Sequence, residues 1–302
     1  MRRPALLAVS TLALASIVAC ERRPPSTASS TAREPTAAQP PAPDERPSEA
    51  EPVALAEPRE VEIQTIDHVT LGATFYPAAS PEAPAVVLAH QLGSTRAEWA
   101  AVIDALREDP AIAVLAIDLR GHGASTQRGG AAISYGDFDA DAWARTADDV
   151  SGAVEWLRSP EISGVRPSRI ALVGASIGAT AVVRAAAEDR TLDVIATLSP
   201  GRAYRGVDSI LVAVNMGPRA FLGVASREET DSAETAEALA RITGGRTEIV
   251  DGRAHGVAML GEHADLTRHV VSFLRESLAA PPVVRPGEAP APTEAAGGAS
   301  AQ

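Results

Sequence analysis

The chain has 302 residues, a length that fits one large domain or two small ones. Its formal net charge of −12 at pH 7 repels the phosphate backbone of nucleic acids, so we expect no nucleic-acid partner. Cys20 is the only cysteine, which excludes an intramolecular disulfide.

Residues 1–20 predict a lipoprotein signal peptide. Arg2 and Arg3 precede an apolar stretch that is too short for a comfortable membrane span and that ends at Cys20. The last four residues, Ile17-Val18-Ala19-Cys20, resemble a bacterial lipobox, in which the cysteine is lipidated and becomes the new N-terminus. An ordinary signal peptide with an incidental cysteine is the alternative. Since two acyl chains anchor a protein stably, we expect a membrane-anchored lipoprotein of the bacterial cell envelope that faces the periplasm or the exterior.

Two segments rich in Pro, Ala, Ser, Thr and Glu flank the rest of the chain. Residues 21–58 and 281–302 hold too few large apolar side chains to offset the entropy of ordering them. They predict a disordered tether and a disordered tail. One domain over residues 59–280 remains, and about 220 residues can bury one sizeable core.

The pattern of the predicted domain begins with a hairpin and continues with alternating strands and helices. Apolar and polar residues alternate over residues 61–75, which indicates a β-hairpin that turns at Asp67-His68. Short apolar runs then predict buried strands at Ala85–Ala89, Ala113–Ile117, Ile170–Val173, Val194–Leu198, Phe221–Ala225 and Thr247–Val250. Apolar residues at three- and four-residue spacing predict helices at Thr95–Leu106, Ala140–Leu157, Ile177–Ala187, Ala233–Arg241 and His263–Leu278.

This alternation indicates an α/β fold. We predict a mainly parallel sheet of eight strands, with an antiparallel hairpin at its N-terminal end and helices on both faces. In such sheets the ligand site lies at the carboxyl ends of the strands. Functional residues are therefore expected where the apolar runs end.

The strand end with the clearest chemical pattern is Gly174-Ala175-Ser176-Ile177-Gly178, where a helix begins at once. A Gly-x-Ser-x-Gly sequence between a strand and a helix is typical of a strained turn that presents a serine nucleophile, here Ser176. The glycines remove Cβ atoms that would collide with neighbouring backbone. A glycine-rich turn whose serine only caps the helix is the alternative.

The loop His90-Gln91-Leu92-Gly93-Ser94 follows the first buried strand. A backbone N–H at this position can complete an oxyanion hole together with the N–H that follows the nucleophile. We therefore predict Leu92 and Ile177 as the two donors. The alternative is a helix-entry loop in which Gly93 merely allows a turn.

Three histidines follow Ser176 in the chain. His255 stands in Gly252-Arg253-Ala254-His255-Gly256, just beyond the last predicted strand, whereas His263 and His269 fall within the pattern of the terminal helix. An imidazole with an unperturbed pKa near ~6.5 can accept the serine proton at neutral pH. His255 is therefore the predicted base.

The loop after the second buried strand reads Asp-x-Arg-Gly-His-Gly-x-Ser over residues 118–125, and it resembles the corresponding loop of α/β hydrolases. With the motifs above and Leu198-Ser199-Pro200-Gly201, residues 61–278 resemble this superfamily, and within it the dienelactone-hydrolase-like and small esterase-like members. The resemblance implies the α/β-hydrolase fold and a structural role for His122. The chain shows no long insertion after Leu198, so we expect little or no lid domain. Two residues depart from it: Ser176 stands where dienelactone hydrolases proper have cysteine, and Gln91 where many relatives have glycine.

The resemblance also implies the chain order nucleophile, acid, histidine. The acid should follow Phe221–Ala225, and matching the next residues to the family pattern puts Glu229 at the acid position. Glu228 and Asp231 remain alternatives, because a slip of one residue changes the choice. A further alternative is an acidic cluster that only opens a helix at Ser232.

These residues predict a serine hydrolase that cleaves a small or medium carboxylic ester, or a related acyl bond, through an acyl-enzyme. The expected partner is a small-molecule acyl substrate, and the chemistry needs neither a metal nor an organic cofactor. Residues 125–139, with Tyr135 and Phe138, are expected to cover the site as a loop. The alternative is a catalytically silent lipoprotein that uses the fold as a binding or scaffold module.

Overall fold

The computed structural model describes residues 56–108 and 111–283 of the chain. The predicted signal peptide, the lipidation site Cys20, and most of the predicted tether and tail lie outside these residues. Within them, no helix combines the length and the apolar character that a membrane span requires. The regular elements begin with β1 (Arg59–Gln64) and end with α9 (Leu266–Ala279).

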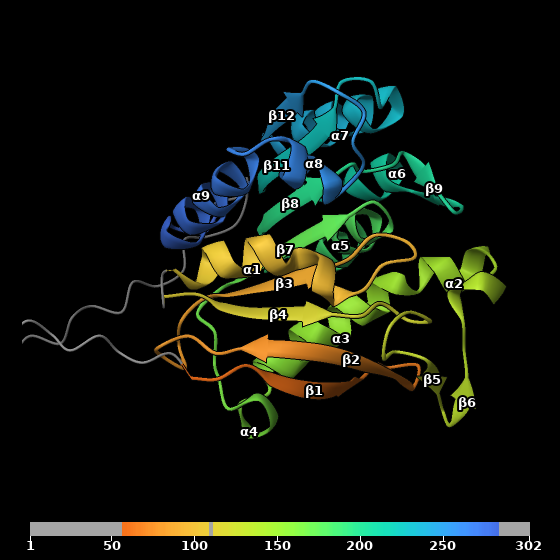
Figure 1. Cartoon of the computed structure of the whole chain (residues 1–302), viewed down its shortest axis with the longest axis vertical. Helices are drawn as coiled ribbons and strands as arrows, with labels where there is room; N and C mark the ends of the chain where they lie inside the picture. The colour runs from red at the N-terminus through yellow and green to blue at the C-terminus, as the bar shows by residue number, and fades with distance from the viewer. Residues whose placement is uncertain (1–55, 109–110, 284–302) are drawn as a thin grey trace, which may run out of the picture. The chain divides into compact units, whose positions relative to one another are not determined.

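A mainly parallel sheet organises the described residues, with the spatial order β12-β11-β8-β7-β3-β4-β2-β5-β6 and β1 paired to β2 (Figure 1). Its parallel strands are β3 (Ala85–Ala89), β4 (Ala113–Ile117), β7 (Ile170–Ala175), β8 (Val194–Leu198), β11 (Ala220–Ser226) and β12 (Arg246–Val250). β1 and β2 (Val69–Tyr76) form an antiparallel hairpin, and β2 also pairs antiparallel with β4. The predicted fold class is confirmed.

Helices cover both faces of this sheet (Figure 1). α1 (Ala100–Arg107) and α9 share one apolar core, on the face nearer the viewer. The second core, on the other face, includes residues from α3 (Thr146–Arg158), α5 (Ile177–Glu188) and α7 (Thr230–Thr243).

The position of β3 between two apolar cores explains why its sequence is apolar without interruption. Its first, third and fifth residues belong to the core with α3 and α5, whereas Val86 and Leu88 belong to the core with α1 and α9. Successive side chains of a strand point to opposite faces, so a strand covered on both faces needs an apolar residue at every position. The end of such a run therefore marks the edge of the sheet.

Within the described residues, the sheet has ten strands rather than the eight predicted. The additional strands, β5 (Gln127–Arg128) and β6 (Ala131–Ala132), form a hairpin whose first strand pairs with β2. Each has two exposed residues, too few for an apolar alternation that the sequence could show.

The predicted and observed helices differ most clearly over residues 140–157 and at the start of the terminal helix. The helix expected over residues 140–157 is divided at Arg145 into α2 (Ala140–Ala144) and α3, and the Thr146 hydroxyl donates to the Trp143 carbonyl at 2.8 Å across this division. The terminal helix begins at Leu266 and not at His263. His263 instead caps α8 (Ala258–Glu262), and its Nε2 lies 2.9 Å from the Asp251 carbonyl oxygen.

The remaining elements are short: η1 (Arg96–Trp99), η2 (Tyr135–Asp137), α4 (Pro160–Ser163), α6 (Ser209–Ala213), and a hairpin of β9 (Ala203–Tyr204) with β10 (Val207–Asp208). The chain between β8 and β11 contains only this hairpin and α6. This segment therefore adds no separate lid domain above the sheet.

Candidate active site

Ser176 occupies the tight turn between β7 and α5. Its backbone has φ 53° and ψ −114°, a combination that a residue with a side chain adopts only when its surroundings hold it there. The Ser176 N–H donates to the Leu198 carbonyl at the end of β8, at 2.9 Å. The neighbouring strand thus holds the strained turn, and the serine is 2 % exposed.

The two glycines of the motif permit close approaches of backbone. A Cβ on Gly174 would lie 2.2 Å from the Gly178 carbonyl oxygen. A Cβ on Gly178 would lie 2.3 Å from the Ala89 carbonyl oxygen and 2.6 Å from that of His90. All three distances are far below van der Waals contact, so glycine is required at each position. The start of α5 therefore lies directly against the end of β3.

This approach brings the two predicted oxyanion donors to the same edge of the sheet. Ile177 is the first residue of α5, so no carbonyl of that helix accepts its N–H. In the loop after β3, the Gln91 N–H donates to Glu98 Oε1 at 2.8 Å, whereas the Leu92 N–H has no acceptor within the described part of the chain. Two backbone donors without an acceptor thus lie at the carboxyl ends of these strands, and one of them belongs to the residue that follows Ser176.

His90 is a fixed structural residue at the base of this loop. Its Nε2 accepts the Leu119 N–H at 2.9 Å, so its Nδ1 carries the proton and donates to the Gln91 carbonyl at 2.7 Å. Burial lowers the pKa of His90 to about 4. The imidazole is therefore neutral at physiological pH, and it links the loop after β3 to the loop after β4.

His255 and Glu229 form a hydrogen-bonded pair. His255 Nδ1 lies 2.6 Å from Glu229 Oε1, and the other carboxylate oxygen accepts the Ser199 hydroxyl at 2.7 Å. Ser199 Oγ in turn accepts the Gly256 N–H at 2.9 Å. The pair is therefore held at both ends, because Ser199 binds the acid and also the residue that follows the histidine.

The other two predicted acids have different partners. Glu228 accepts a hydrogen bond from Arg253 at 2.7 Å, and both side chains are exposed. Asp231 accepts the Arg202 N–H at 3.5 Å. Of the three carboxylates, the structure pairs Glu229 with His255.

The loop that carries His255 also lies against the strand that carries Ser176. A Cβ on Gly256 would lie 3.6 Å from the Cβ of Ala175, which is ordinary van der Waals contact. Gly256 follows His255 in the chain and Ala175 precedes Ser176. The segments that carry the predicted nucleophile and base are therefore close neighbours.

Known proteins resemble the chain both in sequence pattern and in structure. Residues 84–207 match a family model described as the alpha/beta hydrolase fold. The esterase Pf2001 of Pyrococcus furiosus is similar in structure, with 19 % identity and a TM-score of 0.56 over 74 % of this chain and 91 % of that one. The chain has the α/β-hydrolase fold. The resemblance inferred from the motifs is thereby confirmed.

Two further solved structures share this α/β-hydrolase fold. A dienelactone hydrolase from Anabaena variabilis has 18 % identity and a TM-score of 0.54, over 74 % of this chain and 97 % of that one. Est1E from Butyrivibrio proteoclasticus, solved with ferulic acid bound, has 18 % identity and a TM-score of 0.59, over 73 % and 100 %. No curated protein matches the chain in sequence. At these identities the likeness concerns the fold alone.

In this α/β-hydrolase fold the loop after β4 is a structural support. Arg120 is buried and donates to Asp149 on α3 and to Asp67 in the β1–β2 turn. The His122 ring stacks on Tyr135, with ring centroids 4.1 Å apart, and its Nδ1 lies 2.9 Å from the Arg120 carbonyl oxygen. The contacts of His122 are therefore those of a packed, structural residue.

Tyr135 belongs to the segment that was expected to cover the site. Its hydroxyl lies 3.7 Å from where a Cβ on Gly93 would be, so the side chain borders the loop that carries Leu92. The segment is built from the β5–β6 hairpin and η2, and the stacking on His122 holds it to the loop after β4.

Ser199 and Glu98 are the residues of this site whose contacts sequence reasoning missed. Ser199 was noted only as part of a segment that resembles α/β hydrolases. Its contacts with Glu229 and Gly256 reach 30 and 57 residues along the chain, and no local pattern encodes them. Its place at the end of a buried strand is the one signal that could have singled it out.

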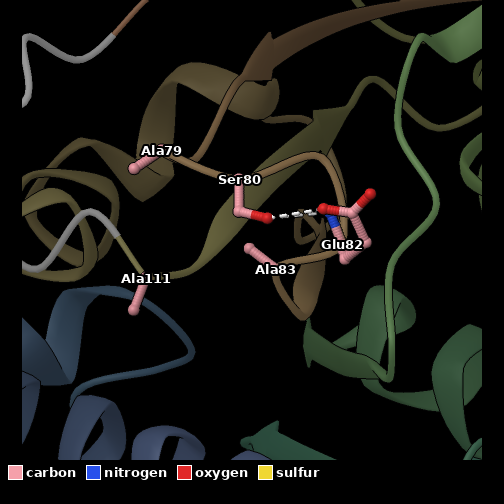
Figure 2. Close-up of a pocket in the computed structure, with 5 residues that line it drawn as sticks. All are labelled: Ala79, Ser80, Glu82, Ala83 and Ala111. Atoms are coloured by element: carbon pink, nitrogen blue, oxygen red, sulfur yellow. Dashed lines mark hydrogen bonds between the residues drawn. The ribbon is translucent and has the colours of Figure 1, made fainter. Parts of the chain in front are cut away.

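A hollow of about 410 Å³ lies at the opposite edge of the sheet (Figure 2). The residues that line it precede β3 and β4, whereas Ser176 follows a parallel strand, and Glu82 there already accepts the Ser80 hydroxyl at 2.7 Å. The hollow therefore takes no part in the site. Across the described residues, no group of three or more His, Cys, Asp or Glu side chains is arranged to hold a metal ion.

Proposed function

We propose that the protein is a serine hydrolase that cleaves a small or medium carboxylic ester, or a related acyl bond, through an acyl-enzyme. Ser176 is the nucleophile, His255 the general base and Glu229 the acid that orients the imidazole. The backbone N–H groups of Leu92 and Ile177 form the oxyanion hole.

The observation that carries this proposal is the hydrogen bond between His255 Nδ1 and Glu229 Oε1, at 2.6 Å. A carboxylate on Nδ1 keeps the proton there, so that Nε2 is free to accept a proton from the nucleophile. The His255 side chain is 45 % exposed, so a substrate can reach the imidazole, whereas the Glu229 side chain is 19 % exposed. This combination suits a base that acts on a substrate and an acid that only supports it.

The backbone around Ser176 supports the rest of the mechanism. The Ser176 hydroxyl would attack the carbonyl carbon while its proton moves to His255 Nε2. The negative charge on the carbonyl oxygen would be stabilised by the two free N–H groups and by the N-terminus of α5. Collapse of this intermediate would expel the alcohol with the proton from His255, and water would then release the acid by the same steps.

The preference for small or medium substrates rests on the absence of a lid domain between β8 and β11 in the described chain. Tyr135, whose hydroxyl borders the loop that carries Leu92, would form part of the acyl or alcohol pocket. Ester hydrolysis is preferred to a silent binding module because the two residues that keep that alternative open, Glu229 at the acid position and Gln91 in the oxyanion loop, both have defined contacts. Glu229 binds His255, and Gln91 binds the Val257 N–H.

Labelling with a fluorophosphonate and turnover of p-nitrophenyl esters of increasing acyl length test this function. Wild-type protein should be labelled and should hydrolyse the shorter esters fastest. Ser176→Ala should abolish both, while Ser168→Ala, which alters an exposed serine, should change neither. A wild-type protein that is neither labelled nor active would contradict the proposal and favour the silent module.

For cellular location, we propose that lipid on Cys20 anchors the protein to a membrane of the bacterial cell envelope. The lipobox-like sequence supports this proposal. Cys20→Ser should move the protein from the membrane fraction to the soluble fraction, measured by fractionation and immunoblotting. An unchanged distribution would contradict lipidation.

A further inference from the structure

We propose that Gln91 is a positioning residue, which fastens the loop carrying Leu92 to the loop carrying His255, and that Glu98 is its support. This inference rests on the proposed function, because it concerns the relative placement of the base and the oxyanion hole.

The side chain of Gln91 bridges the two loops. Its Oε1 accepts the Val257 N–H at 3.2 Å. The same oxygen lies only 2.0 Å from where a Cβ on Gly256 would be. Gly256, with φ 57°, therefore leaves the space that the Gln91 side chain fills. The residue directly after the predicted base is thus shaped to receive a glutamine from the oxyanion loop.

Glu98 holds the other end of this bridge. Its Oε1 accepts the Gln91 N–H at 2.8 Å, and the carboxylate also accepts the Ser94 hydroxyl. The pKa of Glu98 lies above its ordinary value, because burial raises it by more than these hydrogen bonds and the nearby His255 lower it. The next residue, Trp99, is fully buried in the core with α1. The support under Gln91 is therefore fixed to the body of the domain.

Because the Gln91 N–H is bound to Glu98, this donor is withdrawn from the substrate, and the Leu92 N–H is the one that remains available. The loop of His255 is held from its other side by the bond from the Gly256 N–H to Ser199. Ser199 and Gln91 therefore accept the backbone N–H groups of two successive residues, Gly256 and Val257. This arrangement sets the distance between the imidazole and the oxyanion donors.

Loss of the bridge should affect the transition state more than substrate binding, since both loops act together only when the oxyanion and the imidazolium form. Gln91→Met keeps the side-chain length but removes the acceptor oxygen. Gln91→Glu keeps an oxygen that can accept the Val257 N–H. Gln64→Met, an exposed glutamine on β1, is the matched control.

The experiment measures kcat and KM with p-nitrophenyl acetate at the pH optimum of each variant, and amide hydrogen exchange at Val257 by NMR. Gln91→Met should lower kcat about 10- to 100-fold with KM within about twofold. It should also speed exchange at Val257 by at least tenfold. Gln91→Glu should retain slow exchange and a larger share of kcat, and Gln64→Met should resemble wild type.

Three results would overturn the positioning role: unchanged exchange at Val257 in Gln91→Met, faster exchange with unchanged kcat, or equal loss of kcat in the methionine and glutamate variants. A failure of the proposed function looks different. In that case wild type would show neither labelling nor turnover, while exchange at Val257 would still report whether the bridge exists.

Discussion

The side chains of Glu229 and His255 meet between the segments that follow β11 and β12, with Glu229 Oε1 and His255 Nδ1 2.6 Å apart. Glu229 stands at the residue before α7, and His255 in the loop between β12 and α8. A glutamate has one methylene more than the aspartate common at this position in relatives. Ser199 binds the second carboxylate oxygen, so both oxygens of Glu229 have a partner.

Replacing the acid should remove most of the activity. Glu229→Gln should lower kcat about 10³- to 10⁴-fold, because an amide can donate to Nδ1 and so favour the wrong tautomer of His255. Steady-state kinetics with a short p-nitrophenyl ester measures this loss. Glu228→Gln, one residue away and paired with Arg253, is the control and should retain activity. If the two variants exchanged their effects, the role of acid would pass to Glu228.

Removing the Ser199 hydroxyl should affect stability and activity together. Ser199→Ala leaves the Gly256 N–H without its acceptor in a buried site, which costs about 1–3 kcal/mol of unfolding free energy. The kcat should fall about tenfold, because Glu229 loses one of its two partners. Urea denaturation and steady-state kinetics give the two values.

A second substitution at this position separates the hydroxyl from the backbone. Ser199 has φ 48°, which glycine adopts without the steric cost paid by other residues. Ser199→Gly should therefore be more stable than Ser199→Ala by about 1 kcal/mol, with an equally low kcat. A glycine variant with wild-type kcat would show that the hydroxyl has no part in the site.

The buried His90 should make the folded state sensitive to acid. Its pKa is about 4 in the folded protein and near 6.5 in the unfolded chain, so protons bind more readily to the unfolded state. The stability that depends on neutral His90 is therefore complete above pH 6.5 and declines as the pH falls towards 4. At 1.36 kcal/mol per pH unit, the loss is about 3 kcal/mol.

Urea denaturation at pH 7 and pH 4 measures this effect. In His90→Gln the decline over this range should be smaller than in wild type by about 3 kcal/mol. His68→Gln removes an exposed imidazole and should leave the wild-type decline unchanged. An identical decline in wild type and His90→Gln would mean that other groups carry the acid sensitivity.

Replacing only one residue of the buried ion pair between Arg120 and Asp149 should strongly lower the free energy of unfolding. Asp149 is fully buried, and it accepts hydrogen bonds at 2.8 Å from the Arg120 backbone N–H and from its Nε. Asp149→Leu should lower the unfolding free energy by about 3–5 kcal/mol, because it leaves a buried guanidinium without its main partner. The double variant Arg120→Met with Asp149→Leu should lose less than Asp149→Leu alone, measured by urea denaturation. A single variant within about 1 kcal/mol of wild type would contradict this account.

Sequence reasoning identified the strands well for a physical reason. β3, β4 and β8 have the predicted bounds, because strands buried on both faces are nearly continuously apolar, and a polar residue follows each of the three directly. The short β5 and β6 escaped prediction because two exposed residues carry no such pattern.

The residues of the candidate site also differ in how far the sequence could predict them. Ser176 could be singled out because its turn requires glycines at fixed local positions, and the close approaches at Gly174 and Gly178 explain that requirement. The choice of Glu229 over its neighbours depended on a resemblance, since three carboxylates lie within four residues. The contacts of Ser199 and Gln91 could not be predicted, because they join segments 57 and 166 residues apart in the chain.

The alternation of β3 between two cores has a consequence for mutations that change chain length. Inserting or deleting one residue in Ala85–Ala89 would exchange the side chains that face α3 and α5 with those that face α1 and α9. The same slip would displace His90, and with it the loop that carries Leu92, by one strand residue, about 3.3 Å. The register of β3 therefore sets both the packing of the two cores and the geometry at Ser176. The register that buries the correct side chains is also the one that positions the loop with Leu92.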